Sequence, residues 1–73
     1  MPRQIVMDHT GHTCHEFDVK NVVGLKEAED RFRELTGVGF IAAARSESGE
    51  ANVIRKFDPT VEETIFIPRL QGG

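Results

Sequence analysis

The 73-residue sequence contains no tryptophan, no tyrosine and only one cysteine, Cys14. A lone cysteine cannot form a disulfide within these residues and suits a reducing compartment, so we expect a cytoplasmic protein. The five phenylalanines are the only aromatic residues, and we expect them to fill the core. No apolar run approaches the roughly 20 residues of a transmembrane helix. The first residues, MPRQIV, lack the pattern of a signal peptide, so we expect no membrane association.

Basic residues are too few and too scattered to indicate a nucleic-acid partner. Nine Lys and Arg against twelve Asp and Glu give a formal net charge of −3, and no basic run occurs. With 38% hydrophobic and 29% charged residues, the composition fits one small folded domain rather than a disordered chain. So short a chain leaves little room for an enclosed active site. We therefore expect a monomeric binding or carrier protein without a cofactor, not an enzyme.

The first two strands are expected to form a hairpin, because the β-type runs RQIVMD and HTCHEFDV flank the turn signal HTG. A two-residue turn at residues 10 and 11 separates the apolar side chains onto two faces. A three-residue loop, residues 9–11, instead puts Gly11 in a left-handed bulge position and pairs Met7 with Thr13. We prefer this second register because it gathers four apolar residues on one face: Ile5, Met7, Phe17 and Val19.

One amphipathic helix is expected over residues 25–37, LKEAEDRFRELTG. Its apolar residues recur at spacings of three and four along one stripe. Gly37 is placed to cap the C-terminal end, and either Asn21 or Gly24 supplies the start. The charged face is expected to be solvated, with local ion pairs such as Glu27 with Arg31.

Three β-type segments follow the helix, at residues 38–45, 52–57 and 64–69. Before the last of them, Pro59 interrupts the sheet because proline lacks the ladder donor. Thr60 and Glu63 have the spacing of a capping box that opens one short helical turn.

The order of these elements predicts an α+β protein with the β-grasp plan. It comprises a β-hairpin, one helix and then two to three further strands in a mixed sheet. We expect the first and last strands to lie parallel and central, because the helix supplies the crossover that parallel neighbours require.

The segment HTGHTCH concentrates three histidines and the cysteine, residue types that bind zinc. Strand alternation sends Cys14 and His15 to opposite faces and leaves at best His12 and Cys14 together. The same alternation prevents His15 from acting as a base for a Cys14 nucleophile. We therefore expect a polar hairpin edge and no metal site.

The two ends of the sequence, QIVMDHTGHTCHEFDV and RLQGG, resemble those of the ubiquitin-like β-grasp family. The stretch QIVMDHTGHTCHEFDV is similar to the first hairpin of ubiquitin, and RLQGG resembles ubiquitin's final Arg-Leu-Arg-Gly-Gly, with Gln71 in place of the last arginine. The stretch EETIFIPRLQGG is also similar to the tails of small bacterial sulfur carriers of the molybdopterin synthase and thiamine types. Pro68 suits the sulfur carriers, whereas Arg69 and Leu70 suit ubiquitin.

The resemblance implies a domain over residues 1–70 and a flexible C-terminal Gly-Gly tail, residues 71–73, with the Gly73 carboxylate as the reactive group. An activating enzyme would adenylate this carboxylate with ATP, and a conjugating enzyme would transfer the acyl group through a thioester to a target amine. A deconjugating protease is a further expected partner. Alternatively, a sulfurtransferase converts Gly73 to a thiocarboxylate for cofactor or tRNA thiolation. A second alternative is a β-grasp binding module with an inert tail.

The expected recognition segment is the tail itself. Residues 68–73 extend over roughly 20 Å at about 3.3 Å per residue, enough to enter a partner's active site. Gly72 and Gly73 lack Cβ and fit a narrow channel. Arg69 suits acidic groups at the channel mouth and Leu70 an apolar pocket, while Pro68 and Gln71 complete the segment.

Ile65 and Ile67 alternate with Phe66 on the last strand. If Phe66 enters the core, both isoleucines lie on the opposite face. They then form a candidate docking patch beside the tail.

Overall fold

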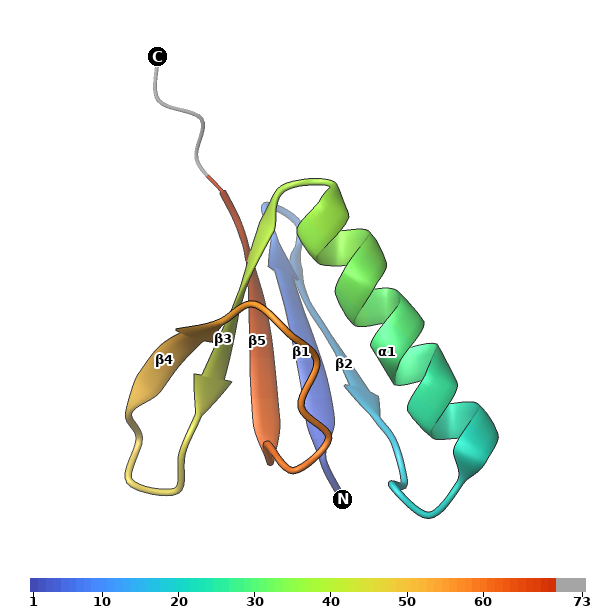
Figure 1. The fold of residues 1–73 in the computed structure, drawn as a ribbon. Helices are drawn as coiled ribbons and strands as arrows, with labels where there is room; N and C mark the ends of the chain where they lie inside the picture. The colour runs from blue at the N-terminus through green and yellow to red at the C-terminus, as the bar shows by residue number, and fades with distance from the viewer. Residues whose placement is uncertain (70–73) are drawn as a thin grey trace.

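The computed structural model describes residues 1–69, which form one helix and a five-stranded mixed sheet (Figure 1). The elements are β1 (Arg3–Asp8), β2 (Gly11–Glu16), α1 (Val22–Gly37), β3 (Phe40–Arg45), β4 (Ala51–Ile54) and β5 (Glu63–Pro68). The strand order is β2-β1-β5-β3-β4, with β1 and β5 parallel and the other neighbours antiparallel. The α+β class, the element order and the parallel first and last strands are as predicted, and the topology is compatible with a β-grasp.

The hairpin between β1 and β2 turns at residues 9 and 10, and neither predicted loop is correct. Asp8 pairs with Gly11, so the register differs by one residue from the preferred one. The Oδ1 atom of Asp8 accepts hydrogen bonds from the backbone N–H of Thr10 at 2.8 Å and from its hydroxyl at 2.5 Å. Gly11 follows with a φ of 132°. An aspartate that bonds to the backbone two residues on closes a tight turn, which explains the shorter loop.

This register moves Phe17 to the other face of the sheet. Phe17 is buried on the side of α1, where its ring centroid lies 5.9 Å from that of Phe57. Met7 is exposed on the opposite face, in the same row as Ile5, and Val19 is exposed beyond the strand. The predicted single apolar face that would unite these residues is therefore wrong.

The helix begins at an asparagine cap. The Oδ1 atom of Asn21 accepts hydrogen bonds from the backbone N–H groups of Val23 and Gly24 at 3.1 and 3.2 Å, which decides between the two predicted starts. Gly37 is the last helical residue rather than the cap. The left-handed backbone instead occurs at Gly39, with a φ of 112°, where glycine is favoured because it lacks Cβ.

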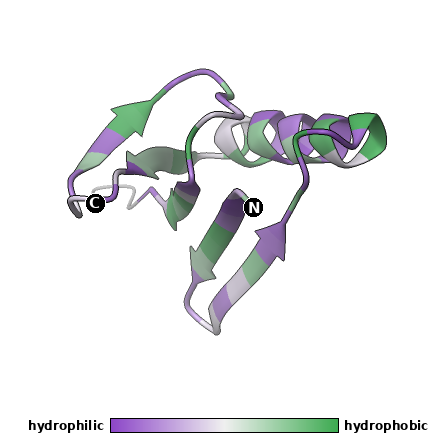
Figure 2. Ribbon diagram, turned by 90° about the horizontal axis from the view of Figure 1, so that it is seen from below, coloured by the Kyte–Doolittle hydropathy of each residue, from purple (hydrophilic) through white to green (hydrophobic). Residues whose placement is uncertain are grey.

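The core lies between α1 and one face of the sheet (Figures 1 and 2). Phe32 and Phe66 are buried at its centre, with ring centroids 5.6 Å apart in an edge-to-face arrangement. Ala42 completes the fully buried cluster, and its small side chain lets the rings approach β3. Partly buried apolar residues surround it: Val6, Leu35, Phe40, Ile54 and Phe57. Phenylalanines thus supply most of the core volume, as predicted.

A buried glutamine ties β1 to α1. The Nε2 atom of Gln4 donates to the carbonyl of Ala28 at 3.0 Å, and its Oε1 atom accepts from Nη1 of Arg31 at 2.9 Å. The fully buried amide is thereby hydrogen-bonded at both ends. Arg31 bonds to the sheet in this way, and among residues 1–69 no ion pair joins it to Glu27.

The connection between β4 and β5 is longer and less helical than predicted. β4 already ends at Ile54, and Asp58 closes a turn by accepting hydrogen bonds from the N–H and hydroxyl of Thr60 at 2.9 and 2.5 Å. Glu63 is the first residue of β5 and binds arginines. The predicted capping box of Thr60 with Glu63 is therefore wrong. Among the residues described, no helix has the length and apolarity that a membrane crossing requires.

Candidate functional site

β5 directs alternate side chains to the two faces of the sheet. Phe66 is fully buried beneath α1, so Ile65 and Ile67 lie on the opposite face. Ile67 is 45% exposed, whereas Ile65 is 8% exposed. Ile65 is less exposed than Ile67 because it lies between two paired strands, opposite Ile5 on β1 and Ala43 on β3.

Apolar side chains from four strands extend this row into what we call the open-face patch. Ile41 lies opposite Ile67 across the β3–β5 ladder, and Val53 lies opposite Ala43 across the β3–β4 ladder. The patch comprises Ile5, Met7, Ile41, Ala43, Val53, Ile65 and Ile67. Within residues 1–69, no helix or strand covers it, because α1 lies on the other side of the sheet (Figures 1 and 2). Four of its residues are exposed, Met7, Ile41, Val53 and Ile67, and neighbouring exposed apolar side chains are typical of a surface that binds another protein.

The exposed residues Met7, Ile41 and Ile67 of the patch lie next to the root of the tail, whereas the exposed Val53 lies on the edge strand β4. β5 ends at the same end of the molecule as the β1–β2 turn and the start of β3 (Figure 1). Pro68 pairs with Phe40, and the backbone N–H of Arg69 donates to the carbonyl of Gly39 at 3.2 Å. The chain is therefore held to the sheet as far as Arg69. The other predicted tail residues lie outside the described residues: Leu70, Gln71, Gly72 and Gly73.

A charged triad occupies the opposite end of this face. Glu63 accepts hydrogen bonds from Nε and Nη2 of Arg3 at 3.0 and 2.7 Å, and Nη1 of Arg45 lies 3.4 Å from its other oxygen. The side chain of Glu63 is 12% exposed. The hydrogen bonds from Arg3, and then the positive charges of both arginines, lower the pKa of the Glu63 carboxyl although burial opposes this.

The triad should stabilise the fold only while Glu63 is ionised. Because the pKa is lower in the folded than in the unfolded chain, the stabilisation is present above the ordinary value of 4.5 and is lost as the pH falls through the folded pKa. We expect Glu63→Gln to lower the Tm by about 3 to 6 °C at neutral pH, and the difference from the wild type to vanish in acid. Thermal unfolding followed by circular dichroism across this pH range measures both.

The matched control is Glu62→Gln at the neighbouring position. Glu62 is exposed, and its one ionic partner among residues 1–69 is the N-terminal amine, 3.9 Å away, so its replacement should change the Tm little. A Tm difference for Glu63→Gln that stays constant from neutral pH into acid would contradict the role of the ionised triad.

The histidines of the hairpin do not converge on Cys14. His12 and Cys14 belong to the open face, whereas His15 pairs with Gln4 on the helix side. Partial burial, and then the positive charge of Arg31, lower the pKa of His15. Among the described residues, no group of three or more potential metal ligands is found.

The chain matches no family model, and no curated protein or solved structure is significantly similar to it. The ubiquitin-like relationship therefore remains a proposal. It depends on the strand order, the parallel pairing of β1 with β5 and the tail sequence.

Most of the open-face patch has no signal in the sequence. Ile41 and Ala43 belong to the run FIAAAR, which is apolar on both faces and shows no alternation. Ile5 and Met7 are identified only once the hairpin register is known. The one readable signal is the alternation of isoleucines around Phe66.

Proposed function

We propose that this chain is a ubiquitin-like protein modifier. An activating enzyme adenylates the Gly73 carboxylate, and the acyl group passes through a thioester to a target amine. The observation that carries the proposal is the place of β5, which pairs in parallel with β1 and leads from the exposed end of the open-face patch into the segment RLQGG.

The chemistry requires only a carboxylate from this chain. A carboxylate oxygen attacks the α-phosphorus of ATP and releases pyrophosphate, which leaves a mixed anhydride. A cysteine thiolate of the partner then attacks the acyl carbon and releases AMP, and the target amine displaces the thiolate to form an amide. The partners supply all catalytic groups, and the cytoplasm supplies the ATP.

The fold supports this role by holding the tail root and offering a docking surface next to it. The hydrogen bond from Arg69 to Gly39 is the last described backbone contact between the chain and the sheet. Four further residues, 70–73, reach about 13 Å from there at about 3.3 Å per residue. The exposed side chains of Met7, Ile41 and Ile67 lie beside this root and suit an apolar partner surface.

A sulfur carrier is the second candidate, favoured by Pro68 at the last position of β5. In that role the terminal sulfur of a partner's persulfide attacks the acyl carbon of the adenylate and releases AMP. A second thiol of the partner then cleaves the resulting acyl disulfide, which leaves Gly73 as a thiocarboxylate and the partner with a disulfide. A binding module with an inert tail is the third candidate.

Intact-mass analysis separates the three candidates. The chain is incubated with an adenylating enzyme, a conjugating enzyme, ATP, a persulfide donor and a lysine-bearing acceptor. A covalent adduct that lacks one water and is linked through Gly73 to a lysine supports the modifier. A gain on the order of 16 mass units, oxygen replaced by sulfur, supports the carrier. An unchanged mass with every adenylating enzyme tried overturns both and leaves the binding module.

A further inference from the structure

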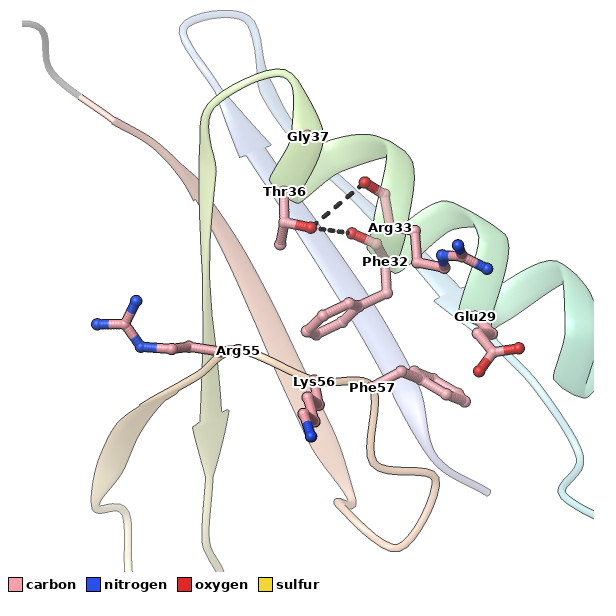
Figure 3. A pocket seen from close by; sticks show the side chains of 8 residues that line it. All are labelled: Glu29, Phe32, Arg33, Thr36, Gly37, Arg55, Lys56 and Phe57. Atoms are coloured by element: carbon pink, nitrogen blue, oxygen red, sulfur yellow. Dashed lines mark hydrogen bonds between the residues drawn. The ribbon is translucent and has the colours of Figure 1, made fainter.

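A cleft of about 590 Å³ lies between α1 and the segment that follows β4 (Figure 3). Phe32 and Phe57 meet edge to face at its floor, with ring centroids 6.0 Å apart. Phe57 is partly exposed there, so the cleft offers an apolar base. This cleft lies on the helix side of the sheet, and no residue of the open-face patch lines it.

The rim of this cleft is basic although the chain as a whole has a net charge of −3. Arg33, Arg55 and Lys56 line it against a single acid, Glu29. All three cations are exposed, and within residues 1–69 none of their side chains takes part in an ion pair or a hydrogen bond. Their charges are therefore available to a partner.

A second cleft of about 430 Å³ continues the first toward the tail root. The two clefts share Thr36 and Arg55. The second adds Arg69 and reaches the edge of the open-face patch at Ile41 and Val53. β4 pairs with β3 only from Ala42 onward, so the edge of β3 at residues 40 and 41 opens into this second cleft. We call the two clefts together the basic track.

We propose that the basic track binds an extended acidic peptide segment of a partner protein. Its carboxylates would pair with the four arginine and lysine side chains, and its apolar side chains would contact Phe57 and Ile54. The open edge of β3 offers backbone groups to an extended chain. This proposal does not depend on activation of Gly73.

The arrangement of the cations favours distributed carboxylates over one compact anion. Figure 3 shows Arg55 and Lys56 directed away from Arg33, so the three groups do not converge on one point. A nucleic-acid backbone carries a charge at every nucleotide, so Glu29 on the rim and the net charge of −3 disfavour it more strongly than a peptide whose carboxylates are spaced apart. Carboxylates spaced along a peptide match cations spaced along a cleft.

The test uses the intact chain and a fluorescein-labelled peptide of alternating glutamate and valine. Fluorescence anisotropy measures the affinity, and amide chemical shifts map the site. We expect binding that weakens with added salt, with shifts at residues 32–37, 40–41 and 54–57. Arg55→Glu should weaken binding about fivefold.

The matched control is Lys20→Glu, which changes the net charge equally but lies outside the basic track, in the β2–α1 connection. Circular dichroism verifies that both variants fold. Equal weakening by both variants would overturn the proposal, as would shifts confined to the open-face residues outside the basic track: Ile5, Met7, Ala43, Ile65 and Ile67. The peptide assignment also fails if oligothymidylate binds the same residues more tightly, or if inorganic phosphate reproduces the shifts at the same concentration.

Discussion

Removal of Gly72 and Gly73 is expected to abolish adenylation while leaving the fold intact. The shortened chain ends on Gln71, whose carboxylate lies about 7 Å short of the original one at about 3.3 Å per residue. A misplacement of even about 1 Å can cost a reaction on the order of 100-fold, so we expect a loss of at least about 1,000-fold. The fold should persist because the last described backbone bond to the sheet is made at Arg69. ATP–pyrophosphate exchange measures the adenylation step directly.

A single alanine appended after Gly73 provides the control. This variant keeps every residue of the chain and moves only the free carboxylate. It should lose pyrophosphate exchange as completely as the truncated chain does. Exchange at the wild-type rate in either variant would show that the Gly73 carboxylate is not the reacting group.

The order of the elements can be predicted from the sequence because each element has a local signal. The stripe that contains Ala28 and Phe32 identifies α1, and both residues are buried against the sheet. Parallel pairing of β1 with β5 then follows, because a helical crossover joins strands that run the same way. The predicted strands are also present, although β3 and β4 are shorter than the predicted ranges, 38–45 and 52–57.

Two errors in the prediction have the same physical origin. In both turns an aspartate accepts hydrogen bonds from the N–H and hydroxyl of a threonine two residues on, Asp8 with Thr10 and Asp58 with Thr60. These side-chain bonds close a turn locally and compete with the glycine bulge or the capped helix. The hydrogen bonds from threonine also lower the pKa of both aspartates. In both turns the Asp-x-Thr pattern decides the local structure, and the nearby glycine or glutamate does not.

The charged triad and the basic cleft cannot be predicted in this way, because they depend on contacts between residues that are far apart in sequence. Arg3 and Glu63 meet only because β1 and β5 pair in one register. Arg33 and Arg55 share a cleft only because Phe57 packs on Phe32. The net charge of the sequence does not reveal this basic cluster, because the chain as a whole is acidic.

Phe66→Ala is expected to remove a large part of the free energy of unfolding. Phe66 is fully buried and its ring contacts Phe32 at the centre of the core. Truncating a buried phenylalanine costs about 3 to 5 kcal/mol, whereas a domain of this size has a free energy of unfolding of about 4 to 11 kcal/mol. Urea denaturation followed by circular dichroism measures the loss.

Ile67→Ala, one position along the same strand, is the matched control. Its side chain is 45% exposed on the open face, so truncation should cost only about 1 kcal/mol, mainly through lower β propensity. The same variant should nevertheless weaken docking of the activating enzyme, because it removes part of the exposed end of the open-face patch. A stability loss equal to that of Phe66→Ala would contradict the assignment of faces on β5. Because Ile67→Ala should stay folded, its effect on docking reports the loss of this side chain alone. Unchanged docking would therefore show that Ile67 is not part of the docking surface.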